Sequence, residues 1–156
     1  MFSDAASVPA RPLDLYAIVD SAERVQQVLA AGVKTVQLRV KKPLDPSAAW
    51  NDILRLDLQR SLAASDAAGA ELFINDHWQA AAQAGARSVH LGQEDLFALG
   101  DAGRAALHAS GMALGISSHS LWELCRARTL RPRYIACGPV WPTLTKVMPW
   151  QKTLWG

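Results

Sequence analysis

The sequence predicts an α/β fold in which parallel strands alternate with helices, and six such strands are recognisable in its 156 residues. Short apolar runs alternate with longer stretches of helical periodicity, the pattern of right-handed βαβ units. Ala-Gly-Ala or Ala-Gly-Val recurs just before three predicted strands, at 31–33, 68–70 and 84–86. No Gly-x-Gly-x-x-Gly follows the first strand, which weighs against a doubly wound dinucleotide-binding sheet. A TIM-type (β/α)8 barrel is therefore the favoured architecture.

Each element follows from local composition. The strands are short runs rich in Val, Ile, Leu and Tyr, and four of the five helices end just before a glycine, which favours a helix C-terminus. Pro46 suits the first turn of the second helix. The predicted strands are 15–19, 35–39, 71–74, 88–91, 113–116 and 133–137. The predicted helices are 21–31, 46–68, 77–84, 101–110 and 120–129.

Length limits this interpretation, because a barrel of this type needs eight strands and at least about 200 residues. We expect only about six strands here, with the last two β/α units missing. The expected organisation is an N-terminal tail at 1–12, an incomplete barrel domain at 13–147 and an aberrant or truncated tail at 148–156. Such a truncation would be expected to impair activity.

Composition excludes several other functions. The formal net charge is only +2, and 19% of residues are charged, which argues against a dedicated nucleic-acid binder. The N-terminus carries no charged segment followed by an apolar run, so we expect no signal peptide and no membrane partner. Cys125 and Cys137 lack metal-ligand spacing and are expected to be buried free thiols. These features predict a cytoplasmic protein.

The candidate site lies at the carboxyl ends of the strands, where β/α barrels place their active sites. Gln37, Arg39 and Lys41 share one face of the second strand and its continuation, because side chains alternate across a strand. An amide and two cations facing the barrel interior would suit an anionic ligand. The alternative is a solvated loop with ordinary surface charges.

Two carboxylates follow neighbouring strands. Asn75 and Asp76 end the third strand, and Asp95 follows the fourth. Adjacent parallel strands lie about 4.8 Å apart, so these aspartates can converge on one cation. Oxygen ligands suit Mg²⁺, which takes part of its shell from substrate phosphates. Helix capping is the alternative role for each aspartate taken alone.

Donors follow the fifth and sixth strands. Ser117 is positioned to donate to a phosphate or to cap the next helix. Thr143, Thr145 and Lys146 form a compact donor cluster in a proline-stiffened loop, which suits a phosphate or carboxylate. His90 lies within a strand, where a hydrogen-bonded interior histidine is the expected role. Cationic donors beside a metal-capable carboxylate pair suit the departure of a diphosphate.

The strand-end motifs closely resemble the thiamine-phosphate synthase (thiamine phosphate pyrophosphorylase) family from about Leu15 to Lys146. The segments His-Leu-Gly-Gln-Glu-Asp at 90–95 and Gly-Pro-Val-Trp-Pro-Thr-Leu-Thr-Lys at 138–146 are specific in combination. The resemblance implies a transferase of thiamine biosynthesis that joins hydroxymethylpyrimidine diphosphate to thiazole phosphate and releases diphosphate, with magnesium assisting. Both substrates are small molecules, and no protein nucleophile is needed.

The resemblance also implies roles for individual residues. Pyrimidine-diphosphate contacts fall on Gln37, Arg39, Lys41, Asn75, Ser117 and Lys146, metal ligands on Asp76 and Asp95, and thiazole-phosphate contacts on Thr143 and Thr145. Two alternatives stay open at this point: a fold-related thiazole tautomerase, which performs no diphosphate chemistry, and an inactive fragment. The Asp76/Asp95 pair and the intact 142–146 segment favour the synthase.

Overall fold

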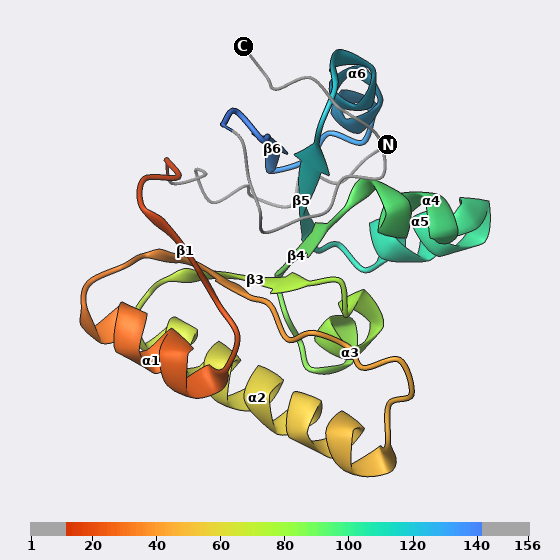
Figure 1. Cartoon of the computed structure of the whole chain (residues 1–156). Coiled ribbons are helices and arrows are strands. Elements are labelled where there is room, and N and C mark those ends of the chain that lie inside the picture. The colour runs from red at the N-terminus through yellow and green to blue at the C-terminus, as the bar shows by residue number, and fades with distance from the viewer. Residues whose placement is uncertain (1–11, 142–156) are drawn as a thin grey trace, which may run out of the picture.

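The computed structural model describes residues 12–141, and these form one parallel sheet with helices packed on it (Figure 1). The strands are β1 (Tyr16–Val19), β2 (Thr35–Leu38), β3 (Glu71–Asn75), β4 (Ser88–Leu91), β5 (Ala113–Ser118) and β6 (Tyr134–Cys137). The helices are α1 (Ala22–Ala30), α2 (Ala48–Ala67), α3 (Trp78–Gln83), α4 (Gln93–Ala98), α5 (Gly100–Ala109) and α6 (Leu121–Thr129).

The strands are ordered β1-β2-β3-β4-β5-β6, and every neighbouring pair is parallel. Each strand therefore pairs with the next one along the chain, an order in which right-handed crossovers place all the helices on one side of the sheet. In cross-strand register, Gln37 stands beside Phe73, and Asn75 beside His90. This arrangement confirms the predicted α/β class: the six strands form a half-barrel.

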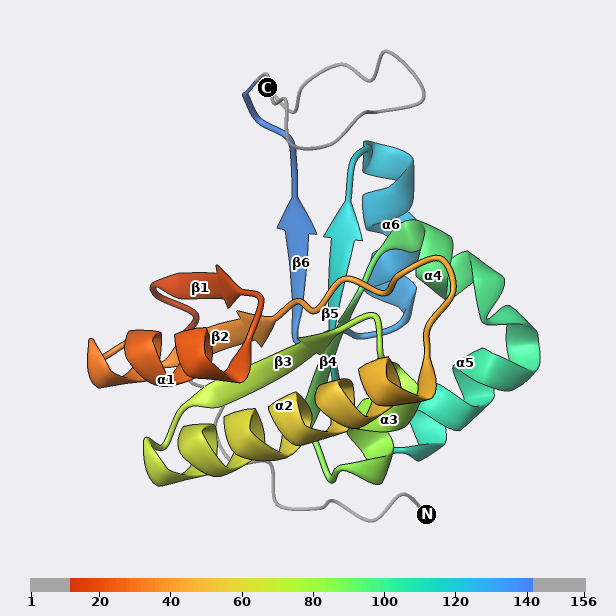
Figure 2. The same ribbon diagram turned by 60° about the horizontal axis from the view of Figure 1, so that its bottom comes forward.

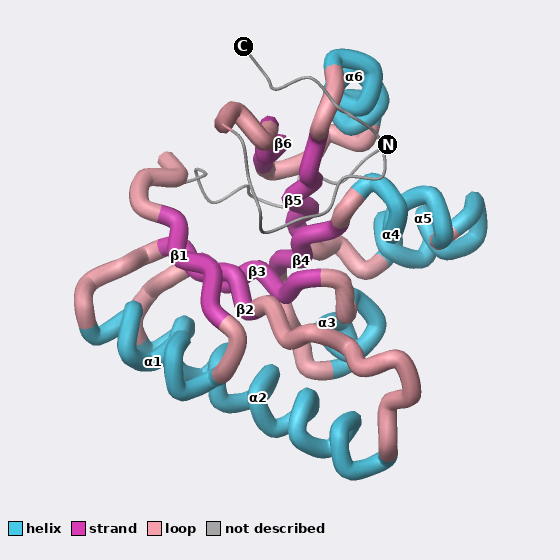
Figure 3. Tube along the Cα trace, viewed as in Figure 1, coloured by secondary structure: helices cyan, strands magenta, loops and turns pink. Residues whose placement is uncertain are grey.

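The helices cover the outer, convex side of the sheet, and the inner side faces the space that the strands curve around (Figures 2 and 3). One apolar cluster joins α1 and α2 to the first strands through residues such as Val25, Leu58 and Leu38. A second joins the later helices to β4 and β5 through residues such as Leu107, Val89 and Ile116. Burying these side chains is the main force that holds helices to sheet.

Alternation along the strands decides which side chains face inward. Val36 and Leu38 pack against the helices, so Gln37 between them faces the inside of the half-barrel. The same reasoning places Asn75 and His90 on the inner face, since their strand neighbours belong to the outer clusters. The predicted division of β2 into a polar inner face and an apolar outer face is confirmed.

Two sequence expectations were wrong. Residues 93–98 form helix α4, in a segment where we predicted no helix; acidic residues in the first turn favour a helix because they complement its dipole. Cys125 and Cys137 are free thiols as expected, but both are exposed rather than buried. Among residues 12–141, no helix has both the length and the hydrophobicity needed to cross a membrane.

Candidate active site

The carboxyl ends of β2, β3 and β4 carry three buried polar side chains on the inner face of the sheet. Gln37, Asn75 and His90 are each at most 6% exposed, in a region otherwise filled by Phe73 and the tyrosines of the edge strands. Buried polar groups are stable only when they are hydrogen-bonded. The Gln37 amide nitrogen donates to the Tyr16 hydroxyl over 3.0 Å. Gln37 and Asn75 therefore lie where the sequence predicted.

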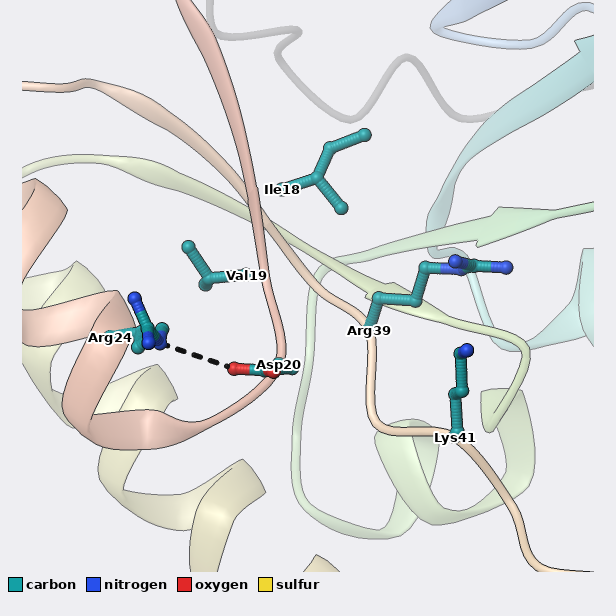
Figure 4. Close-up of a pocket in the computed structure, with 6 residues that line it drawn as sticks. All are labelled: Ile18, Val19, Asp20, Arg24, Arg39 and Lys41. Carbon is teal, nitrogen blue, oxygen red and sulfur yellow. Dashed lines mark ion pairs between the residues drawn. The ribbon is translucent and has the colours of Figure 1, made fainter. Parts of the chain in front are cut away.

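Two cations extend from the segment that follows β2. A cavity of about 630 Å³ is lined there by Arg39 and Lys41 together with residues at the end of β1. Figure 4 shows the charged ends of Arg39 and Lys41 on the same side of the β2 segment, on the side away from the Asp20–Arg24 ion pair. Within residues 12–141, neither Arg39 nor Lys41 forms an ion pair. The pair is thus available to an anionic ligand.

The β2 segment is fixed by its neighbours. The Arg39 backbone amide donates to the Val19 carbonyl over 2.7 Å, which extends the pairing with β1. His77 Nε2 lies 2.7 Å from the Val40 carbonyl oxygen, so it donates there and ties this segment to the loop after β3. That loop also carries Asp76, and the cations and the carboxylate are therefore held in a defined relative position.

Asp76 and Asp95 lie beside each other, as the sequence predicted. The pKa of the Asp76 carboxyl is raised by its partial burial and then by the Asp95 charge and a hydrogen bond to the Asp95 side chain. The electrostatic influence of His77 and Arg39 opposes this rise in the Asp76 pKa. Both aspartates remain open to solvent. Two carboxylates held this close repel each other when both are ionised.

Capping explains one of these aspartates only in part. The Asp95 carboxylate accepts the Gly92 backbone amide over 3.2 Å at the start of α4, so it does cap that helix. The N-cap residue of α3 is His77, and no side chain caps that helix. Asp76 has a positive φ of 61°, a conformation that Asp and Asn adopt more readily than other residues with a side chain. The capping alternative for Asp76 is not supported.

The donor set fits a magnesium ion. No group of three or more His, Cys, Asp or Glu residues that could hold a metal occurs among residues 12–141. Mg²⁺ is held by one or two carboxylates together with waters and substrate phosphates. Asp76 and Asp95 would supply the carboxylates.

Ser117 stands on β5 opposite β4, and its hydroxyl oxygen is 2.9 Å from His90 Nε2. The N-cap of α6 is Ser120, whose hydroxyl accepts the Glu123 amide. The capping alternative for Ser117 is therefore wrong, and its hydroxyl belongs to the inner face. His90 is a hydrogen-bonded interior histidine, as predicted. Burial lowers the pKa of its imidazole to about 4, and the charge of Arg39 adds to this effect, so the ring is neutral at pH 7.

Sequence reasoning missed Tyr16 and Tyr134. Their hydroxyl oxygens lie 2.6 Å apart, and the Tyr134 hydroxyl is 2.7 Å from His90 Nδ1. Both tyrosines could have been placed by the alternation of side chains along a strand, since each one lies on the inner face of a short strand and the residue next to it faces outward. The predicted contacts Thr143, Thr145 and Lys146 lie outside the described residues.

Comparison with known proteins gives a consistent result. A family model described as thiamine monophosphate synthase matches residues 15–155. A thiamine-phosphate synthase of Neisseria meningitidis serogroup A is 46% identical over 138 residues, which cover 88% of this chain and 63% of the relative. One from Rhizobium etli is 45% identical over 135 residues, covering 86% and 62%. One from Yersinia pestis (strain Pestoides F) is 47% identical over 137 residues, covering 88% and 60%.

A solved structure is also similar. Thiamine phosphate pyrophosphorylase from Pyrococcus furiosus matches with a TM-score of 0.69 and 25% identity, covering 84% of this chain and 62% of that one. The chain thus spans about three fifths of the length of the relatives it matches.

Proposed function

The chain belongs to the thiamine monophosphate synthase family, and we propose that it takes part in condensing hydroxymethylpyrimidine diphosphate with thiazole phosphate to give thiamine phosphate and diphosphate. The observation that supports the proposal is that Arg39 and Lys41 line one cavity after β2, while Arg39 is close enough to Asp76, the neighbour of Asp95, to lower its pKa. A diphosphate with its counter-cation needs both kinds of group at one place.

We assign the pyrimidine diphosphate to the carboxyl ends of β2 to β5. Arg39 presents a planar guanidinium that can hold two phosphate oxygens at once, and Lys41 adds a point charge. Gln37, Asn75 and Ser117 lie deeper on the inner face and would contact the same substrate by hydrogen bonds. Lys146 would complete this set, and Thr143 and Thr145 would contact the thiazole phosphate.

Magnesium, held by Asp76 and Asp95, would neutralise charge on the departing diphosphate. The reaction then requires no protein nucleophile, since the electron-rich pyrimidine stabilises the cation left at its methylene carbon and the thiazole nitrogen captures it. The chain's own contribution is to orient the two substrates, to place Arg39 and Lys41 where negative charge develops, and to keep water away from the cation.

The test is direct. The full chain is incubated with hydroxymethylpyrimidine diphosphate, thiazole phosphate and Mg²⁺, and thiamine phosphate and diphosphate are quantified by chromatography. We expect equimolar products that disappear with a chelator and in the Asp76→Asn variant. Isomerisation of the thiazole without diphosphate release, or no product at all, would contradict the proposal.

A further inference from the structure

Five polar side chains form one continuous hydrogen-bonded relay across the inside of the half-barrel. The Gln37 amide nitrogen donates to the Tyr16 hydroxyl over 3.0 Å, and the Tyr16 and Tyr134 oxygens are 2.6 Å apart. Tyr134 continues to His90 Nδ1 at 2.7 Å, and His90 Nε2 reaches the Ser117 hydroxyl at 2.9 Å. The relay therefore joins two proposed ligand contacts, Gln37 and Ser117, through three residues with no assigned role.

The direction in which the hydrogen bonds of the relay are donated follows from Gln37. Because the Gln37 N–H donates to Tyr16, the Tyr16 proton is left to donate to Tyr134, and the Tyr134 proton to His90 Nδ1. A neutral imidazole carries a single N–H, so that proton sits on Nε2 and donates to Ser117. With the Gln37 amide nitrogen facing Tyr16, the opposite direction would leave the Tyr16 proton without an acceptor among residues 12–141.

This direction determines what Ser117 offers to a ligand. Its oxygen accepts from His90, so its own proton is not used within the relay. No other partner of the Ser117 hydroxyl exists among residues 12–141. A hydroxyl that accepts one hydrogen bond is polarised and becomes a better donor, and an anionic oxygen is the strongest acceptor it can meet.

Packing holds Tyr134 at the centre of the relay. Its ring stacks on the His90 imidazole with centroids 5.6 Å apart and planes 17° apart. Phe73 contacts it edge-on at 5.0 Å, and Tyr16 at 5.5 Å. Gly115 lies directly beneath, where a Cβ would stand only 2.6 Å from the Tyr134 hydroxyl oxygen. The ring is thus packed against four neighbours.

We propose that Tyr134 is a positioning residue, which holds His90 as the Nε2–H tautomer so that the Ser117 hydroxyl proton is kept for an anionic oxygen of the ligand. The inference rests on the proposed function only for the nature of that ligand. The tautomer itself is a property of the ligand-free protein and can be measured without any activity.

The first experiment is nitrogen-15 NMR of the imidazoles in the full chain at pH 7, with the His90 signals assigned from their loss in His90→Asn. We expect the Nε2–H tautomer in the wild type and a mixture of tautomers in Tyr134→Phe. Phe73→Leu serves as the matched control, because it disturbs the same aromatic cluster but removes no hydrogen bond, and it should keep the wild-type tautomer. An Nδ1–H tautomer in the wild type, or no change in Tyr134→Phe, would overturn the proposal.

The second experiment measures inorganic diphosphate binding with Mg²⁺ by calorimetry. We expect Ser117→Ala to weaken binding about tenfold, Tyr134→Phe to weaken it less, and the double variant to match Ser117→Ala. If the double variant lost affinity by the product of the two single-variant factors, Tyr134 would not act through Ser117. If the wild-type chain bound no diphosphate, the result would count against the proposed function. The nitrogen-15 signals of His90 would still show whether Tyr134 sets its tautomer.

Discussion

The hydroxyl oxygens of Tyr16 and Tyr134 lie 2.6 Å apart, although the two residues stand on β1 and β6, the two edge strands of the sheet. A flat sheet of six strands would separate its edges by about 24 Å, so this contact requires strong curvature. Burial raises the pKa of both phenols, and both remain protonated donors at any physiological pH.

His90 should make the stability of the chain depend on pH. Its pKa is about 4 in the folded state, against 6.5 for an unperturbed histidine. At pH values between about 4 and 6.5, His90 is protonated in the unfolded chain but neutral in the folded chain. The free energy of unfolding therefore falls as the pH drops below about 6.5. From pH 7 to pH 5 this single group should cost about 2 kcal/mol.

The measurement is urea unfolding at pH 7 and pH 5 for the wild type and His90→Gln. Other groups titrate in both proteins, so the difference between the two pH dependences isolates His90. We expect the wild type to lose about 2 kcal/mol more than the variant over this range. Equal losses would mean that the folded protein accepts the proton at His90 as easily as the unfolded chain does.

Gly115 should be required by Tyr134 rather than by its own backbone. An alanine Cβ would overlap the Tyr134 ring, and overpacking of this kind costs about 1–3 kcal/mol. We expect Gly115→Ala to lose that much stability in the wild type and little in a Tyr134→Leu background. A double-mutant cycle by urea unfolding gives the coupling, and the same cost in both backgrounds would contradict this prediction.

The sequence was sufficient for the strands because their signals are local. Every predicted strand overlaps the observed one, and alternation alone placed Gln37 on the inner face. Helix α4 was missed because Asp95 was considered only as a carboxylate that follows the fourth strand. Leu96 is the one buried residue of α4, and a single buried residue in a short segment gives no periodicity to detect.

The relay could not be predicted for a different reason. Tyr16 and Tyr134 are 118 positions apart, and whether they meet depends on how strongly the sheet curves. The Asp76/Asp95 pair was predictable because these residues follow adjacent strands, whose spacing is fixed. Contacts between residues on neighbouring strands can therefore be predicted from sequence alone, whereas contacts across the inside of the half-barrel require the structure.

The aspartate pair should make the chain respond to Mg²⁺. Ionised Asp76 and Asp95 repel each other, and a bound cation removes that repulsion and stabilises the folded state by mass action. We expect Mg²⁺ at millimolar concentration to raise Tm by a few degrees in the wild type and not in Asp76→Asn or Asp95→Asn.

Asparagine is the appropriate replacement at Asp76, because it tolerates the positive φ of 61°. Without Mg²⁺, Asp76→Asn should be at least as stable as the wild type, since it removes one of two repelling charges. Glu94→Gln is the matched control, an exposed carboxylate in the same helical turn as Asp95. If it abolished the Mg²⁺ response as well, the assignment of the metal to the aspartate pair would be wrong. In the condensation of the two substrates, either aspartate variant should lower turnover by orders of magnitude.

Arg39 should bind the diphosphate through two parallel hydrogen bonds, which only a guanidinium can supply. Arg39→Lys keeps the charge but loses this geometry, and the loss of one charge-assisted hydrogen bond should weaken hydroxymethylpyrimidine diphosphate binding about tenfold or more. Calorimetry with Mg²⁺ measures this affinity directly. Arg87→Lys is the matched control, because Arg87 precedes β4 at the opposite end of the sheet and pairs there with Asp66 at 2.9 Å. Wild-type affinity in Arg39→Lys would show that Arg39 contributes only its charge.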